Sequence, residues 1–159
     1  MNETGLKILK DEIGEGLDAV SKVMSRAESA ALRKGAQVLK KNTKSNLTST
    51  GIRIGANPLY IDKLSDGVMS SKVKDGSVVV HVMGTRKKGS GTFRLRFFEG
   101  GTKERYQKTW RGKPLKTPRR LGHIKSYGFF NSALGSSTDE VMKAMDETLT
   151  KYIQKAWNK

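Results

Sequence analysis

Residues 86–125 hold 14 of the chain's 31 lysine and arginine residues but only two acids, Glu99 and Glu104. This stretch has a formal net charge of +12, out of +16 for the whole chain. Concentrated positive charge costs self-repulsion unless a partner screens it, so the stretch predicts a basic arm that binds an anionic surface. The packed frame that holds the arm has to come mainly from the residues on either side. We therefore expect a protein that works by binding rather than by catalysis.

The composition sets limits on the frame and on its chemistry. A length of 159 residues predicts a single domain, 1–159, and an apolar fraction of 35% predicts a modest core. The absence of cysteine excludes disulfides and thiolate chemistry. Residues 1–7 lack the pattern of a signal peptide, and no apolar run is long enough to span a membrane. These features predict a soluble, intracellular protein.

Helical periodicity marks both ends of the chain. Apolar residues recur at steps of three and four near the N-terminus, which predicts a long helix over 17–45. Gly14 and Gly16 predict a break or kink before it, with 1–16 as a weakly ordered segment. The small residues in 27–36 would let another backbone approach closely.

The C-terminal segment is strongly amphipathic. Ser137 or Thr138 is suited to cap a helix, and Asp139 and Glu140 favour the positive end of its dipole. One apolar stripe then follows the helical period: Val141, Met142, Met145, Leu149, Tyr152, Ile153, Ala156 and Trp157.

The middle of the chain predicts strands followed by a loop. Segments 68–74 and 77–83 flank Asp75-Gly76, a pair typical of a type I′ hairpin turn. A third strand is expected over 92–98, with Phe93, Leu95 and Phe97 facing inward. Residues 103–127 show no sustained period and predict a long basic loop or arm, in which local strand structure is also compatible with the sequence. The expected fold is α+β, with the two helices packed on a small antiparallel sheet of three to four strands.

Nothing in the sequence predicts an active site. His81 and His123 have no partner at metal-ligand spacing, and the glycine-rich segments 89–92 and 100–103 lack the full spacing of a phosphate-binding loop. Glu99 lacks the companion acids that two-metal chemistry needs. We expect no catalytic residue, no metal site and no cofactor.

Two features around the arm allow alternative interpretations. Glu99 is either an exposed acid before a turn or a partner for arginines of the arm or of a neighbouring subunit, and Gly100-Gly101 would let the backbone turn sharply. Phe129-Phe130 is favoured as core over a partner-binding pair, because aromatic residues dominate core burial.

The arm itself combines aromatic and basic residues. Tyr106 and Trp110 lie among lysines and arginines, which suits single-stranded nucleic acid, a protein interface or a solvated loop equally well. The candidate DNA- or partner-binding residues are Arg86, Lys87, Lys88, Arg94, Arg96, Lys103, Arg105, Lys108, Trp110, Arg111, Lys113, Lys116, Arg119 and Arg120.

Several short motifs occur in a characteristic order. Leu64-Ser65-Asp66-Gly67-Val68 precedes the valine-rich hairpin, and Arg96-Phe97-Phe98-Glu99-Gly100-Gly101-Thr102 precedes the arm. Gly128-Phe129-Phe130-Asn131-Ser132-Ala133 opens the last helix. With the long Ala/Lys-rich helix before them, these motifs resemble the tail-completion or head–tail joining (neck) proteins of long-tailed double-stranded DNA bacteriophages. Gly128 departs from the proline usual in that family, and the arm is longer and more basic.

The resemblance implies a non-enzymatic virion component, made in the host cytoplasm and located in the neck. It implies a homo-oligomeric ring, usually hexameric, between the connector and the tail tube. The strand edges and the small-residue face of the first helix are the expected contacts between copies, because rings need heterologous interfaces. The arm would then meet double-stranded DNA in the channel or an acidic neighbouring ring. The alternative is a free-standing basic nucleic-acid-binding module, with a nuclease or toxin-like enzyme built around Glu99 as a distant third.

Overall fold

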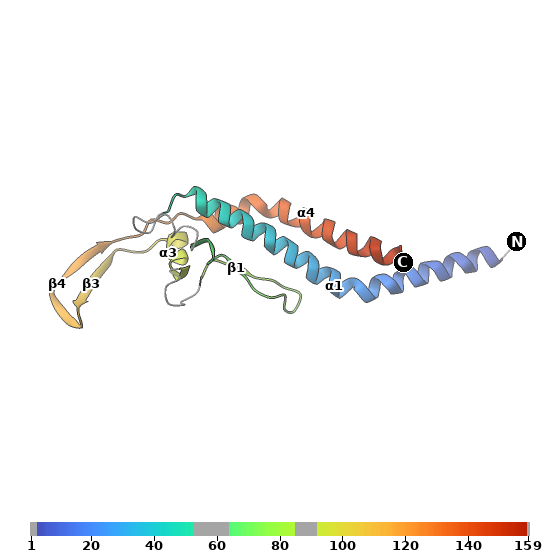
Figure 1. Ribbon diagram of the computed structural model, residues 1–159, viewed down its shortest axis with the longest axis horizontal. Helices are drawn as coiled ribbons and strands as arrows, with labels where there is room; N and C mark the ends of the chain where they lie inside the picture. Colours follow the sequence, from blue (N-terminus) through green and yellow to red (C-terminus); the bar gives the residue numbers. More distant parts are fainter. Residues whose placement is uncertain (1–2, 53–63, 85–91, 159) are drawn as a thin grey trace. The chain divides into compact units, whose positions relative to one another are not determined.

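The computed structural model describes residues 3–52, 64–84 and 92–158 (Figure 1). In this part of the chain the fold is α+β, as predicted, with a long helix near each end and two small antiparallel sheets. The chain divides into two compact units. The first contains the residues up to Leu39, Ser71–Val79 and the residues from Ser137 onward, and the second contains Lys40–Ser70 and Val80–Ser136.

A pair of antiparallel helices forms most of the first unit. Helix α1 spans Glu3–Ser49 and helix α4 spans Phe129–Trp157. Within this unit the two lie side by side (Figure 1), since Gly16 meets the ring of Trp157 and Gly35 meets Met145. A Cβ atom on Gly35 would lie 2.8 Å from Cγ and Sδ of Met145, so a larger residue here would require the Met145 side chain to move.

Small residues of α1 line the face toward α4, as the sequence predicted for a closely approaching backbone. Ala27, Ala31 and Ala36 are buried, and so is Ala156 of α4. The approaching backbone belongs to the same chain, so this face of α1 is already covered without a second copy.

Both predicted helix starts are wrong. Helix α1 is not broken at Gly14 and Gly16, because 47 residues of helix and the contact with Trp157 outweigh the cost of about 1 kcal/mol for each glycine. Its blue N-terminal part does bend away from the rest of the helix, in line with the predicted kink (Figure 1). Helix α4 begins at Phe129 rather than at Ser137 or Thr138, and Ser137 is buried inside it.

The predicted hairpin around Asp75-Gly76 forms, with shorter strands than expected. Strand β1 (Met69–Ser70) pairs with β2 (Val80–His81) in the second unit. In the first unit Lys74 and Ser77 exchange two backbone hydrogen bonds, with N···O distances of 2.9 Å each. The backbone torsion φ is +49° at Asp75 and +67° at Gly76, as a type I′ turn requires.

We expect Gly76→Ala to weaken this turn locally. The added methyl group would meet open space, so its cost is the left-handed backbone conformation alone, about 1–2 kcal/mol. Hydrogen exchange at the Ser77 N–H, which donates to Lys74 O, should accelerate about five- to thirtyfold. Lys72→Ala, an exposed side chain outside the turn, is the control. Unchanged exchange at Ser77 in Gly76→Ala would contradict the turn assignment.

The core of the second unit brings together distant parts of the sequence. Leu47 at the end of α1 joins Leu64, Val68, Leu95 and Phe129, each at most 2% exposed. Asn46 Nδ2 also donates to the carbonyl oxygen of Phe129 at 3.4 Å. The second unit therefore forms where the end of α1 meets the start of α4.

The predicted third strand is wrong. Residues 92–98 form a 3₁₀ turn, η1 (Thr92–Arg94), and the start of a short helix, α3 (Leu95–Gly100). Leu95 and Phe98 are three residues apart, so a helix directs both toward the core, where Phe98 packs against the buried cluster. The described sheets have two strands each, β1–β2 and β3–β4, rather than three or four strands in one sheet.

Candidate partner-binding hairpin

The predicted basic loop is a second β-hairpin. Strand β3 spans Arg105–Trp110 and β4 spans Lys113–Gly122, and the two pair as an antiparallel ribbon (Figure 1). Arg111 and Gly112 connect them with φ values of +49° and +77°, the torsions of a two-residue type I′ turn. The arm expected over 103–127 therefore contains paired strands, the local strand structure that its sequence allowed, rather than a loop throughout. The arm has a defined register.

That register sorts the side chains onto two faces. Residues directly opposite each other share a face, and alternate residues of β3 do so as well. In β4 the alternation is interrupted by a register shift between Arg119 and Pro114, so its faces are assigned from the residues opposite. Tyr106 is opposite Arg120 and Trp110 is opposite Lys113, so the first face carries Tyr106, Lys108, Trp110, Lys113 and Arg120. The second face carries Arg105, Gln107, Thr109, Pro114 and Arg119. Cations therefore occur on both faces of the ribbon.

The hairpin is open to solvent along its length. No residue in 105–122 is buried, and Tyr106 and Trp110 are 52% and 57% exposed. These 18 residues include seven lysines and arginines and no acid. An isolated two-stranded hairpin is marginal in water, so its base has to be held by the body.

Hydrogen bonds close the base of the hairpin. Thr102 N–H donates to Ile124 O at 3.0 Å, and Ile124 N–H donates to Thr102 Oγ1 at 2.9 Å. Gly101 turns the chain sharply into β3 with φ of +71°, as its sequence predicted, and a Cβ there would lie 3.0 Å from Ser126 N. We call this pairing of 101–102 with 124–126 the hairpin base.

Glu99 has a role that neither sequence interpretation gave it. Its side chain is half-buried and accepts hydrogen bonds from the first turn of α4: Phe130 N–H to Oε2 at 2.8 Å and Asn131 N–H to Oε1 at 3.1 Å. The carboxylate therefore caps the helix and complements its positive end. Its carbonyl oxygen also accepts from Ser126 Oγ at 2.6 Å and from Gly128 N–H at 3.2 Å. Sequence inspection missed this cap because it joins residues about thirty positions apart.

The acid that does pair with an arginine of the arm is Glu104. It forms an ion pair with Arg120 across the hairpin, where both groups are partly exposed. Arg111 lies over the ring of Trp110, with Cζ 6.0 Å from the ring centroid. The interpretation in which Glu99 pairs with an arginine of the arm is therefore wrong, and so is the one in which it is a simple exposed acid.

The other candidate residues do not all join the hairpin. Arg94 and Arg96 are exposed on η1 and α3, next to the rings of Phe93 and Phe97. Arg86, Lys87 and Lys88 lie outside the described residues. The hairpin and its base bring together the remaining candidates: Lys103, Arg105, Lys108, Trp110, Arg111, Lys113, Lys116, Arg119 and Arg120.

The residues of the two sequence motifs that flank the arm fall into two groups. Phe129 is 1% exposed and Phe130 packs against the core, which confirms the core interpretation of this pair. Gly100 ends α3, while Gly101 and Thr102 belong to the hairpin base.

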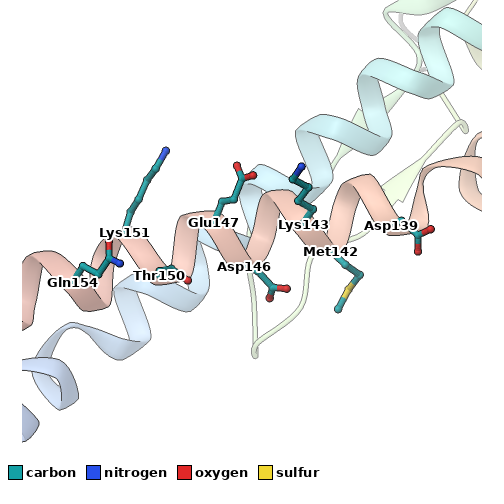
Figure 2. A pocket seen from close by; sticks show the side chains of 8 residues that line it. All are labelled: Asp139, Met142, Lys143, Asp146, Glu147, Thr150, Lys151 and Gln154. Atoms are coloured by element: carbon teal, nitrogen blue, oxygen red, sulfur yellow. The ribbon is translucent and has the colours of Figure 1, made fainter.

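The outer face of α4 carries a shallow depression lined by one helix (Figure 2). The side chains in Figure 2 spread around α4 instead of converging: Lys143 and Glu147 point to one side, and Met142 and Asp146 to the other. Charges of both signs along a helix are typical of a solvated face. This depression is therefore a weaker candidate site than the hairpin.

Outside the hairpin, the described residues offer few other candidate sites. Within residues 3–52, 64–84 and 92–158, no three His, Cys, Asp or Glu side chains gather as a metal site would require. His81 Nδ1 is shielded from solvent and has no hydrogen-bond partner among the described residues. None of the described helices combines the length and apolar character needed to cross a bilayer.

The chain matches no model of a known protein family, no curated protein and no solved structure.

Proposed function

We propose that this chain is a structural protein of a bacteriophage neck, joining or completing the tail at the head–tail interface as a ring. The observation that carries the proposal is an exposed, strongly basic hairpin held at its base by a packed body. No residue of this extension is buried within its own described chain, which supports a place for it in a larger assembly. The role requires binding and no catalysis.

The contacts around Glu99 support the family resemblance behind this proposal. The two motifs that flank the arm, Arg96–Thr102 and Gly128–Ala133, are far apart in sequence. Through Glu99 they are joined by hydrogen bonds to Phe130 and Asn131. The motifs therefore form one structural unit with the hairpin inserted between them, which gives their shared order a physical reason.

The ring needs a heterologous contact, in which one patch meets a different patch on the next copy. The small-residue face of α1, first expected to serve there, is covered by α4 of the same chain. We propose instead that exposed apolar side chains outside that face take part, among them Met83, 62% exposed, and Val79, 57% exposed.

Removing the hairpin while keeping its base tests the joining role. Residues 105–122 are replaced by a short Gly-Ser linker in a phage genome that encodes this chain, which preserves the Thr102–Ile124 pairing. Electron microscopy of lysates should show complete heads and complete tails that are not joined. The matched control carries Lys22→Gln, Arg33→Gln and Lys34→Gln on exposed positions of α1 and should assemble normally. Normal yields of infectious particles from the hairpin deletion would refute the joining role.

A further inference from the structure

We infer that the β3–β4 hairpin binds the phosphodiester backbone of double-stranded DNA without reading its sequence. The inference rests on the proposed function for its biological place, since it names the partner of the same hairpin. Its physical grounds are the charge, shape and exposure of residues 105–122.

Charge is the first ground. Glu104 neutralises Arg120, and in the part of the chain that the structure describes no other salt bridge reaches the hairpin. Six cations remain on the ribbon: Arg105, Lys108, Arg111, Lys113, Lys116 and Arg119. They lie on both faces, at the turn and along both strands, so they match a partner that presents negative charge on more than one side.

Shape is the second ground. Paired strands lie about 4.8 Å apart, so a two-stranded ribbon with its side chains fits the major groove of DNA, about 12 Å wide. In that position the cations of the two faces would meet the phosphates of opposite strands. Contacts of this kind position a protein on DNA but carry no sequence information.

The aromatic residues argue against single-stranded nucleic acid as the main ligand. Proteins that bind single strands stack successive bases on neighbouring aromatic rings. Tyr106 and Trp110 are four residues apart on one strand, about 13 Å, and Lys108 lies between them. Arg111 also lies over the Trp110 ring, with Cζ 6.0 Å from the ring centroid, where a stacked base would have to displace it.

The same spacing argues against a protein partner. The buried centre of a protein interface is depleted in charged residues and requires contiguous apolar surface. On the hairpin, the two exposed aromatic rings are separated by a lysine and surrounded by cations. Duplex DNA requires no such apolar centre.

The test measures binding of the full chain to a fluorescent duplex of random sequence over a salt series. If about six phosphates are neutralised, the slope of log K against log salt concentration should be about −5. The hairpin variant carries Lys108→Gln, Arg111→Asn and Lys113→Gln. Asn-Gly is the preferred pair for a type I′ turn, so the register survives the substitution. This variant should lose at least about tenfold in affinity at 0.1 M salt, and its slope should weaken by about three.

A charge-matched control separates the hairpin from the net charge of the chain. Lys22→Gln, Arg33→Gln and Lys34→Gln remove three exposed cations from α1 and should change the affinity less than threefold, within about 0.7 kcal/mol. Equal losses in the two triple variants would overturn the inference, because they would indicate a generic polycation. Tighter binding to single strands, lost in Trp110→Leu, would overturn it as well. So would tighter binding to polyglutamate than to duplex DNA.

The outcomes separate this inference from the proposed function. Duplex binding that depends on the hairpin, together with normal particles from the hairpin deletion, would refute the neck role and leave DNA binding standing. Absent duplex binding, together with unjoined heads and tails, would refute the DNA partner and leave the joining role standing.

Discussion

Phe129→Ala is expected to lower the free energy of unfolding by about 3–5 kcal/mol, the largest effect of any single substitution considered for this chain. Phe129 is 1% exposed and contacts the cluster that contains Leu47 and Leu95. Its removal leaves a cavity where α1, α3 and the start of α4 meet in the second unit. Urea denaturation followed by circular dichroism, with linear extrapolation to water, measures the change.

A solvent-facing residue of the same helix provides the comparison. Met142 is 54% exposed, so Met142→Ala should change stability by about 0.5 kcal/mol or less. A loss below about 1 kcal/mol in Phe129→Ala would show that this phenylalanine does not fill a packed core.

Glu99→Ala is expected to cost about 2 kcal/mol, the second-largest effect on stability. The substitution removes the acceptor for Phe130 N–H and Asn131 N–H and the negative charge at the start of α4. Hydrogen exchange at these two amides should accelerate together with the loss of stability, because the first turn of the helix frays when its cap is lost.

Glu99→Gln keeps the shape of the side chain and one acceptor oxygen but removes the charge. It should cost about half as much as the alanine variant, since one of the two hydrogen bonds survives. Unchanged exchange at Phe130 and Asn131 in Glu99→Ala would be incompatible with a capping role.

The sequence predicted the two helices because their stability is largely local and periodic. It misplaced their starts because the contacts that determine them join residues far apart in the sequence. Helix α1 continues through Gly14 and Gly16, where Trp157 from the other end of the chain packs against Gly16. Helix α4 begins eight residues before Ser137, because its cap comes from Glu99 rather than from an adjacent serine or threonine.

The segment 92–98 shows how two periods can coexist in a short run of residues. Phe93, Leu95 and Phe97 recur at every second residue, as on one face of a strand. Leu95 and Phe98 are three residues apart, as on one face of a helix. Packing decides between them: Leu95 lies so close to Gly67 that a Cβ there would overlap Leu95 Cδ1. Local propensity cannot predict this contact, because its two residues are far apart in the sequence.

The hairpin was predicted as a basic arm with all seven of its lysines and arginines, and local strand was allowed in it, but the pairing of β3 with β4 was not predicted. Pro114 and Pro118 argue against a strand, and Arg111-Gly112 is not a preferred hairpin turn. The prolines are tolerated because a ribbon of two strands has only edge strands, and β4 carries an irregular register between its pairings to Gln107 and Thr109. The phage neck role and the DNA partner remain predictions, to be decided by the experiments above.

The shared position of the hairpin base and the helix cap has a mechanical consequence. A pull on the hairpin tip passes down its two strands to Thr102 and Ile124, and from there to Glu99 and Ser126, which contact each other. The carboxylate that would feel this tension is the one that holds the first turn of α4. Load at the tip would therefore bear on the two hydrogen bonds that hold the first turn of α4.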